Sequence, residues 1–513
     1  MLCFTKFENT DEYKIAGLDI HIFYPVIGMI FYGNFLFLLN FFLPLSTRYI
    51  LLFALFLVPN FLVVPNFIFL KKGFKNLLIY LLLLIPSYNL TYHYDSGLYH
   101  LNYQALLRES NVILGISNIY GPYGIGSIYE YISASLWFDS TMVLLQFVNL
   151  LFFILFYEFL INLLSRKDNN FLNSAGLGLL IFSILDNFGV GGGRNGYLYV
   201  QSLGKQDVTL AIMYLITAVM MFLILSKNKL EKNELLIISI FTLFILQLKV
   251  SGVTIFLVYL VFLYRVFRDR FSQKNIFLDL SIPFLLGVFW IFKSILQTGC
   301  IIFPLDASCF DTLSWYSAEN IKVTLESGQD FSIAYDFNSS IVVWLSEFLE
   351  YEINGTIVIN FIISFFIIFI IFFKRNLNNQ TKNVNILNFI ILFNIIFFLY
   401  YGPHFRYLIA TQLISIFLIG YIRAPRINVI SALIYPLIVI SVISLVRLDS
   451  YKSFNFFEHP KHEIPLPELK EYDSRYLPKI GDQCWTVKDC SPNRMYYDIR
   501  DLRFFSIVEF REQ

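Results

Sequence analysis

Long apolar blocks separated by short polar connections run through most of this chain. Two of them are LLFALFLVPNFLVVPNFIFL at residues 51–70 and FIISFFIIFIIFF at residues 361–373. A helix of about 20 mostly apolar residues is long enough to cross a lipid bilayer. The pattern therefore predicts an all-α, polytopic membrane protein. About thirteen transmembrane helices are predicted, near residues 22–43, 49–70, 76–90, 141–164, 171–189, 207–226, 235–248, 251–264, 276–297, 355–373, 384–400, 406–422 and 427–447.

Two of these predicted helices, 235–248 and 251–264, are short and meet at Lys249, Ser251 and Gly252. Short or broken helices at membrane depth are tolerated only where protein or a water-filled cavity covers the backbone. The break therefore indicates a site inside the membrane domain.

Basic residues in the connections orient the helices. Lys71, Lys72 and Lys75 mark the connection after the second predicted helix as cytoplasmic. The N-terminal segment is acidic and lacks a basic region followed by a cleavage site, so we expect no removable signal peptide. With the connections alternating, the N-terminus lies inside, and three loops of the transmembrane domain (1–447) lie outside: 91–140, 190–206 and 298–354.

Composition agrees with a membrane location and excludes one class of partner. Of all residues, 57% are hydrophobic and 15% are charged, compared with roughly 45–50% and 25% in soluble domains. The formal net charge is +1, and there is no basic patch of the kind that binds nucleic acid.

The segment 448–513 is polar and proline-rich, so we expect an extracytoplasmic cap there. It contains Cys484 and Cys490, while Cys300 and Cys309 lie in a predicted outer loop. All four fall on the predicted oxidising side, where disulfides persist. Four cysteines allow three connectivities. We favour the pairs that are close in sequence, with free thiols as the alternative.

A polar cluster directly follows the third predicted helix, in HYDSGLYHLNYQALLRES. It contains His93, Tyr94, Asp95 and His100. Polar clusters beside an apolar span tend to be functional, which makes Asp95 a candidate catalytic group and His93, Tyr94 and His100 candidate substrate-binding groups. Alternatively, Asp95 is only the N-cap of the helix that follows, or a solvated carboxylate.

Apolar residues recur after Asp95 at Leu98, Leu101, Ala105 and Leu106. This spacing predicts an amphipathic helix that lies in the membrane interface.

Candidate anion-binding residues stand in two further segments. GVGGGRNGYLYVQSLGKQD contains Arg194 and Lys205, and its glycines let backbone amides approach an anion. A flexible connection is the alternative, and no nucleotide P-loop motif is present. In YYGPHFRYLIA, His404 and Arg406 stand at the outer end of a span, where a guanidinium can clamp a phosphate.

Lys249 and Lys293 stand near the outer ends of short spans. We expect their side chains to extend to lipid headgroups rather than to serve the site. Trp137, Trp315 and the tyrosines are suited to stacking on sugar rings, although anchoring at the membrane interface explains most of them better.

Several motifs together resemble the GT-C superfamily of polytopic glycosyltransferases, which use lipid-phosphate-linked sugars. They are the acidic loop YHYDSGLYH, the downstream GISNIYGPYGIGS, and the P-x-x-R-[FY] pattern at residues 403–407. The chain is also similar to a bacterial branch of membrane proteins within that superfamily, through YDSGLYHL, GCIIFPLDASCFDTLSW and GDQCW. The acidic loop shows one clear acidic residue where the superfamily has an Asp–Glu pair.

The resemblance implies a GT-C fold, an active site on the outer face of a bacterial cytoplasmic membrane, and a general base, Asp95. It also implies that Arg406, with Arg194 or Lys205, stabilises the phosphate of a polyprenyl-phosphate sugar donor. The acceptor would be a glycan or lipid of the cell envelope. Whether a divalent cation takes part stays open. A metal site formed by His93, Asp95 and His100 also stays open.

Two other functions stay open. One is a polymerase or ligase of lipid-linked polysaccharide. The other is a transporter or flippase, which should show ionisable residues midway along several spans and two repeated halves. Most charges lie at span ends and no repeat is evident, which favours surface chemistry.

Overall fold

A computed structural model describes much of the chain, and all structural statements concern its described residues. These are 14–46, 48, 91–137, 143–166, 170–188, 202–203, 206–227, 230–231, 233–268, 276–332, 340–350, 384–401, 405–422, 464–472, 475–492, 497–501 and 505–510. The predicted spans 49–70, 76–90, 355–373 and 427–447 lie outside them.

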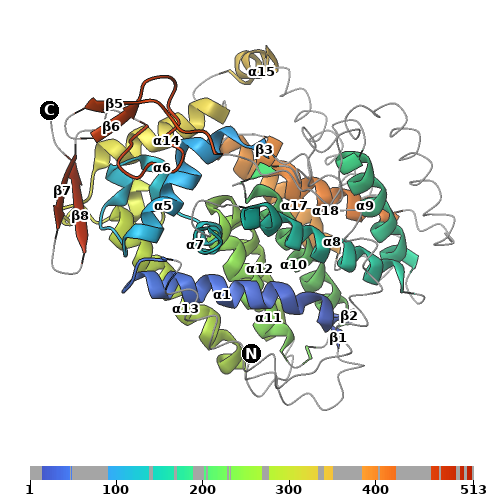
Figure 1. The fold of residues 1–513 in the computed structure, drawn as a ribbon. Coiled ribbons are helices and arrows are strands. Elements are labelled where there is room, and N and C mark those ends of the chain that lie inside the picture. The colour runs from blue at the N-terminus through green and yellow to red at the C-terminus, as the bar shows by residue number, and fades with distance from the viewer. Residues whose placement is uncertain are drawn as a thin grey trace.

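Apolar helices form the main body (Figure 1). They are α1 (Tyr24–Asn40), α8 (Val148–Leu164), α9 (Asn170–Phe188), α10 (Asp207–Lys227), α11 (Glu234–Leu248), α12 (Val253–Arg268), α13 (Ile276–Thr298), α17 (Val384–Tyr401) and α18 (Ile409–Ile422). Within the described residues, four helices are long and apolar enough to cross a membrane: Ile20–Asn40, Asp207–Lys227, Val250–Arg268 and Ile276–Thr298. The described part is thus mostly helical and typical of a membrane protein.

Helices α10 and α13 are both apolar but differ in how much of their surface other parts of the protein cover. The sequence of α10 is apolar on every face, and its 18-residue apolar window is 100% buried among neighbouring helices. In α13 only 11% of that window is buried, and Phe277 and Phe284 are largely exposed. An apolar helix face left open in this way is suited to lipid.

The predicted break near Lys249 is confirmed. Helix α11 ends at Leu248, a short 3₁₀ turn η7 (Val250–Gly252) follows, and α12 begins at Val253. Gly252 lies against α11, because a Cβ there would stand 2.6 Å from the carbonyl oxygen of Ile245.

The predicted outer loop 91–140 contains several short elements. They are β3 (Thr91–Tyr92), the π-helix η4 (Ser96–His100), α5 (Leu101–Glu109), η5 (Ile116–Asn118), α6 (Gly121–Gly124) and α7 (Ile128–Ser135). The prediction of an amphipathic helix with one free face after Asp95 is wrong. Residues 101–107 of α5 are all buried, including the polar Asn102 and Gln104, because α7 and the C-terminal tail cover them.

The expectation of an all-α membrane protein holds for the mostly helical body, and the tail adds short strands. The tail forms two antiparallel hairpins: β5 (Leu469–Tyr472) pairs with β6 (Arg475–Pro478), and β7 (Tyr497–Asp501) pairs with β8 (Ser506–Phe510). Two small pairs also occur elsewhere, β1 (Lys14–Ile15) with β2 (Leu18–Asp19), and β3 with β4 (Ser202–Leu203). The tail is too polar to cross a membrane. Outside the bilayer its backbone groups can form hydrogen bonds with neighbouring strands and with water, so a helix is not required.

The tail and the predicted outer loop 298–354 both pack on the 91–137 segment. Figure 1 shows the hairpins beside α5, α6 and α14 (Ala318–Ser332), away from α8, α9 and α18. The amide of Asn118 donates to the carbonyl oxygens of Trp315 and Val508, at 2.9 and 3.0 Å. Segments far apart in sequence therefore meet around this loop.

A further helix, α15 (Ile341–Glu350), exposes apolar residues such as Val342.

Candidate active site

Asp95 stands at the start of the π-helix η4. The helix is closed by the N–H of Leu101, which donates to the carbonyl oxygen of Ser96. Single π turns are rare and occur frequently at functional sites. The Asp95 carboxylate caps no backbone N–H of the helix, and the side chain is 18% exposed. The N-cap explanation of this aspartate is therefore wrong.

His93 performs the capping instead. Its carbonyl oxygen accepts the N–H of Ser96 at 2.8 Å, and its ring Nδ1 accepts the N–H of Asp95 at 3.1 Å. A ring nitrogen that accepts carries no proton, so the imidazole is neutral in this arrangement. Oδ2 of Asp95 also lies 3.7 Å from Nδ1, and this approach becomes an ion pair only if His93 is protonated.

The disulfide loop of the tail (484–490) and the two residues before it lie against the same segment. The hydroxyl of Tyr94 donates to Oδ1 of Asp482 in a short hydrogen bond. Nε2 of Gln483 donates to the carbonyl oxygen of Tyr94 at 2.9 Å, and the N–H of Trp485 donates to the carbonyl oxygen of Gly97 at 2.8 Å. The tail therefore holds the backbone on both sides of Asp95.

Gly97 permits this contact because it has no side chain. A Cβ built on Gly97 would stand 2.7 Å from Cε2 of Trp485. The Trp485 ring also makes an edge contact with Tyr92, with 5.7 Å between ring centroids. Further along α5, Nδ2 of Asn102 donates to the carbonyl oxygen of Val487. The tail is thus anchored along η4 and α5.

The carboxylates of Asp482 and Asp95 raise the pKa values of two tyrosines, Tyr94 and Tyr120. The hydrogen bond to Asp482 is the main cause that raises the pKa of the Tyr94 hydroxyl to about 12, and the charges of Asp482 and Asp95 add to it. Burial raises the pKa of Tyr120 well above its usual value, and the same two carboxylates raise it further. Both phenols are therefore protonated at neutral pH, and Tyr94 donates its proton to the Asp482 carboxylate.

His100, at the end of the π-helix, contacts a carboxylate that sequence reasoning missed. Its Nδ1 forms a hydrogen bond with Oε1 of Glu130 on α7, and both side chains are almost fully buried. Ser127 caps α7 by accepting the N–H of Tyr129 at 3.1 Å, which fixes the direction of the helix. The spacing of Ser127 and Glu130 resembles a capping box, but the carboxylate turns toward α5.

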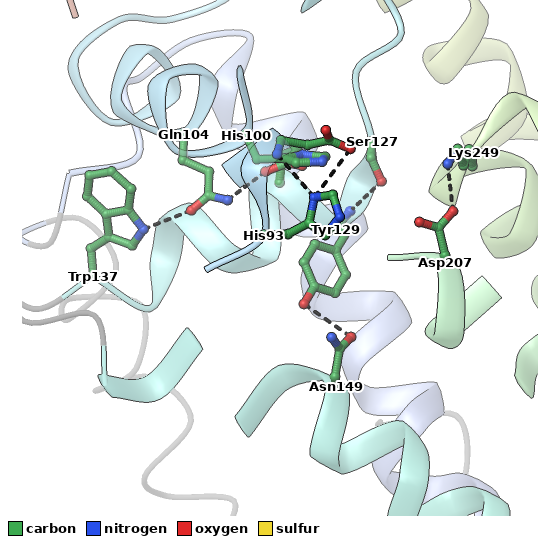
Figure 2. Close-up of polar contacts among 11 residues, drawn as sticks. His93, His100, Gln104, Ser127, Tyr129, Trp137, Asn149, Asp207 and Lys249 are labelled. Carbon is green, nitrogen blue, oxygen red and sulfur yellow. Dashed lines mark hydrogen bonds and ion pairs between the residues drawn. The ribbon is translucent and has the colours of Figure 1, made fainter. Parts of the chain in front are cut away.

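A chain of hydrogen bonds orients this pair, as Figure 2 shows in part. The indole N–H of Trp137, which can only donate, donates to Oε1 of Gln104 at 2.8 Å. Nε2 of Gln104 must then be the donor to Oε2 of Glu130, at 2.6 Å. A carboxylate that accepts from Gln104 also favours a proton on Nδ1 of His100. Trp137 is therefore a buried donor and not an interface anchor.

A second polar group lies at the helix break, separate from the first in Figure 2. Nζ of Lys249 is 2.6 Å from Oδ1 of Asp207, the first residue of α10. The ammonium also lies 4.6 Å from the ring centroid of Tyr407. The expectation that Lys249 extends to the headgroups is therefore wrong, because its charge is paired inside the protein.

Lys293 on α13 is also buried, with 2% of its surface exposed. Its Nζ donates to the carbonyl oxygen of Gly126 at 3.4 Å and lies 4.2 Å from the ring centroid of Trp290. Gly126 has no Cβ to keep this amine away, since a Cβ would stand 2.6 Å from Nζ. This lysine does not extend to the headgroups either.

Other predicted site residues are not brought into the cluster by the described structure. Arg194, Lys205 and His404 lie outside the described residues. Arg406 belongs to the backbone of η11 (Phe405–Leu408), and its side chain lies outside the described part. Among the described residues, no group of three His, Cys, Asp or Glu side chains is arranged to hold a metal ion.

Both expected disulfides are present. Cys300 is bonded to Cys309, and Cys484 is bonded to Cys490. The second bond closes the loop 484–490, which contains Trp485, the residue whose N–H donates to Gly97.

Comparison with known proteins identifies a family. Residues 10–413 match the model of a family described as a domain of unknown function (DUF8201). The chain belongs to this family. Neither the curated proteins nor the solved structures contain a match to it. The DUF8201 region includes Asp95 and Glu130, while Asp482 lies beyond its end.

Proposed function

We propose that this protein is an integral membrane glycosyltransferase of GT-C type, with Asp95 as its general base. It would transfer a sugar from a polyprenyl-phosphate donor to a cell-envelope acceptor on the outer face of a bacterial cytoplasmic membrane. In this proposal the chain crosses the membrane about thirteen times, and the 91–140 loop faces outward. The four candidate spans and the two disulfides are compatible with that arrangement.

The setting of Asp95 is the observation that carries the proposal. Its carboxylate is partly exposed and caps no helix N–H. It lies at the start of the π-helix, between Tyr94 and Gly97, the two residues that the tail contacts. A carboxylate in such a setting can take the proton of a hydroxyl group as that oxygen becomes a nucleophile.

The chemical step is a direct displacement. The acceptor oxygen forms a bond to the anomeric carbon of the donor sugar, and its proton passes to the Asp95 carboxylate. The bond between that carbon and the phosphate oxygen breaks, and the phosphate keeps the electron pair. We assign stabilisation of the phosphate to Arg406, with Arg194 or Lys205, because a guanidinium matches phosphate oxygens in two-point contact. The backbone of Arg406 directly precedes Tyr407, whose ring lies beside Lys249.

The test is sugar transfer by purified, full-length protein in nanodiscs of phosphatidylethanolamine and phosphatidylglycerol. Radiolabelled undecaprenyl-phosphate glucose, galactose and mannose serve as donors, and a panel of oligosaccharides and lipids serves as acceptors. Asp95→Asn should lower kcat by about a hundredfold or more, since positioned general bases contribute roughly that much. Glu326→Gln, which changes an exposed carboxylate on α14, should leave transfer unchanged. Full activity of Asp95→Asn would remove Asp95 as the base.

A transporter or flippase is the second candidate, and the Asp207–Lys249 pair favours it. Charged residues paired at a helix break within the membrane domain often mark an ion or substrate path. The same nanodisc protein, moved into sealed liposomes, separates the two functions. Movement of the lipid-linked probe across the bilayer without transfer would support transport.

A further inference from the structure

The tail contacts the chain on both sides of Asp95, through its disulfide loop (484–490) and the two residues before that loop. The Tyr94 hydroxyl donates to the Asp482 carboxylate, and the Trp485 N–H donates to the carbonyl oxygen of Gly97. Asp95 lies between the two contacted residues. A second carboxylate, nearly 400 positions away in the sequence, is thereby brought to the segment that contains the candidate base.

The charges of Asp482 and Asp95 raise the pKa values of the same two tyrosines, Tyr94 and Tyr120. Burial is the largest cause of the raised pKa of Tyr120, and the charges of Asp482 and Asp95 both add to it. Both charges also act on Tyr94, after its direct hydrogen bond to Asp482. The geometry agrees, because Asp482 is hydrogen-bonded to Tyr94 and Asp95 directly follows Tyr94 in the chain.

We infer that Asp482 is a second carboxylate of the active site, which binds a hydroxyl of the acceptor beside the one that Asp95 deprotonates. This inference rests on the proposed function and narrows it. Two carboxylates and two phenols can engage neighbouring hydroxyl groups of one sugar ring, and hydrogen bonds to a charged acceptor are the stronger ones. The acceptor class indicated is a glycan with vicinal hydroxyls, in preference to a lipid alcohol with a single hydroxyl.

Asp482→Asn removes the charge but keeps an oxygen that can accept the Tyr94 hydroxyl, so the tail can remain docked. Asp489→Asn is the matched control, because Asp489 is an exposed aspartate seven residues further along the same part of the tail. Hydrogen exchange of residues 481–491 reports whether the tail stays docked. In the nanodisc assay, Asp482→Asn should raise KM for glycan acceptors about tenfold, since a hydrogen bond to a charged group is lost. KM for the donor and kcat should change little, and Asp489→Asn should resemble the wild type.

Binding without turnover separates this inference from the proposed function. Quenching of tryptophan emission measures the affinity for glucose, galactose, mannose and N-acetylglucosamine. A wild-type enzyme that transfers sugar, with unchanged acceptor KM and saccharide affinity in Asp482→Asn, would overturn the inference and leave the proposed function standing. Weaker binding together with lost protection of 481–491 would assign Asp482 a docking role and also overturn it. A wild-type protein that neither binds saccharides nor transfers sugar would overturn both.

Discussion

Substituting Gly97 by alanine is expected to release the tail from the candidate active site. The new Cβ would stand 2.7 Å from Cε2 and 2.9 Å from Cδ2 and Cζ2 of Trp485. These are atoms in the middle of a rigid ring system, so a small rotation does not remove the clash. The backbone of Trp485 also has little freedom to move, because its N–H is bonded to Gly97 and its φ of 51° lies in the left-handed region.

The size of the effect follows from two opposing contributions. Overpacking a close contact costs about 1–3 kcal/mol, while replacing glycine by alanine within a helix contributes about 1 kcal/mol of stability. The docked tail should therefore lose roughly 1 kcal/mol, and at most about 2 kcal/mol. Gly28 on α1 is a matched control, because a Cβ there would meet nothing within 4 Å. Gly28→Ala should be neutral or slightly stabilising.

Amide hydrogen exchange of the full-length protein in nanodiscs measures docking. In Gly97→Ala, exchange across residues 481–491 should become roughly fivefold faster, since a loss of about 1 kcal/mol in local opening free energy sets the rate. Exchange in α10 should stay the same in both variants. Equal protection of the tail in the wild type and Gly97→Ala would refute the packing argument.

Two further predictions concern the groups that support the site. Glu130→Gln keeps the size of the side chain but places an amide donor against the donors of His100 and Gln104. The free energy of unfolding should therefore fall by about 2–3 kcal/mol. A thermal melt in detergent checks this against Glu326→Gln, and equal melting temperatures would contradict it. Replacing Cys484 and Cys490 by serine should speed exchange at 481–491, because the closed loop is no longer constrained. The Cys300→Ser, Cys309→Ser variant should leave exchange at 481–491 unchanged, and a matching loss of protection there would count against a local role of the tail disulfide.

The helices were largely predictable because a bilayer forces each spanning segment to satisfy its own backbone hydrogen bonds. Length and hydropathy therefore place α1, α10 and α13 within a few residues of the predictions. The break at Lys249 was predictable for the same reason, because two short apolar segments with a polar junction cannot form one continuous span. The predicted disulfides rested on sequence proximity and on alternating loop charges.

The polar partners were not predictable, because they depend on how distant segments pack. Local sequence favoured Asp95 as a helix cap, but His93 takes that role once the π turn forms. Lys249 looked like a lysine near a membrane surface until α10 brought Asp207 within 2.6 Å of it.

The acidic segment after the third predicted helix still marks the candidate site, since its composition is local and unusual beside an apolar span. Its chemistry depends on residues that no local pattern connects to it. Glu130 reaches His100 from another helix, and Asp482 reaches Tyr94 from the tail. Hydrogen bonds between side chains follow from the three-dimensional packing of helices and tail, and a single sequence does not encode that packing in any short-range pattern.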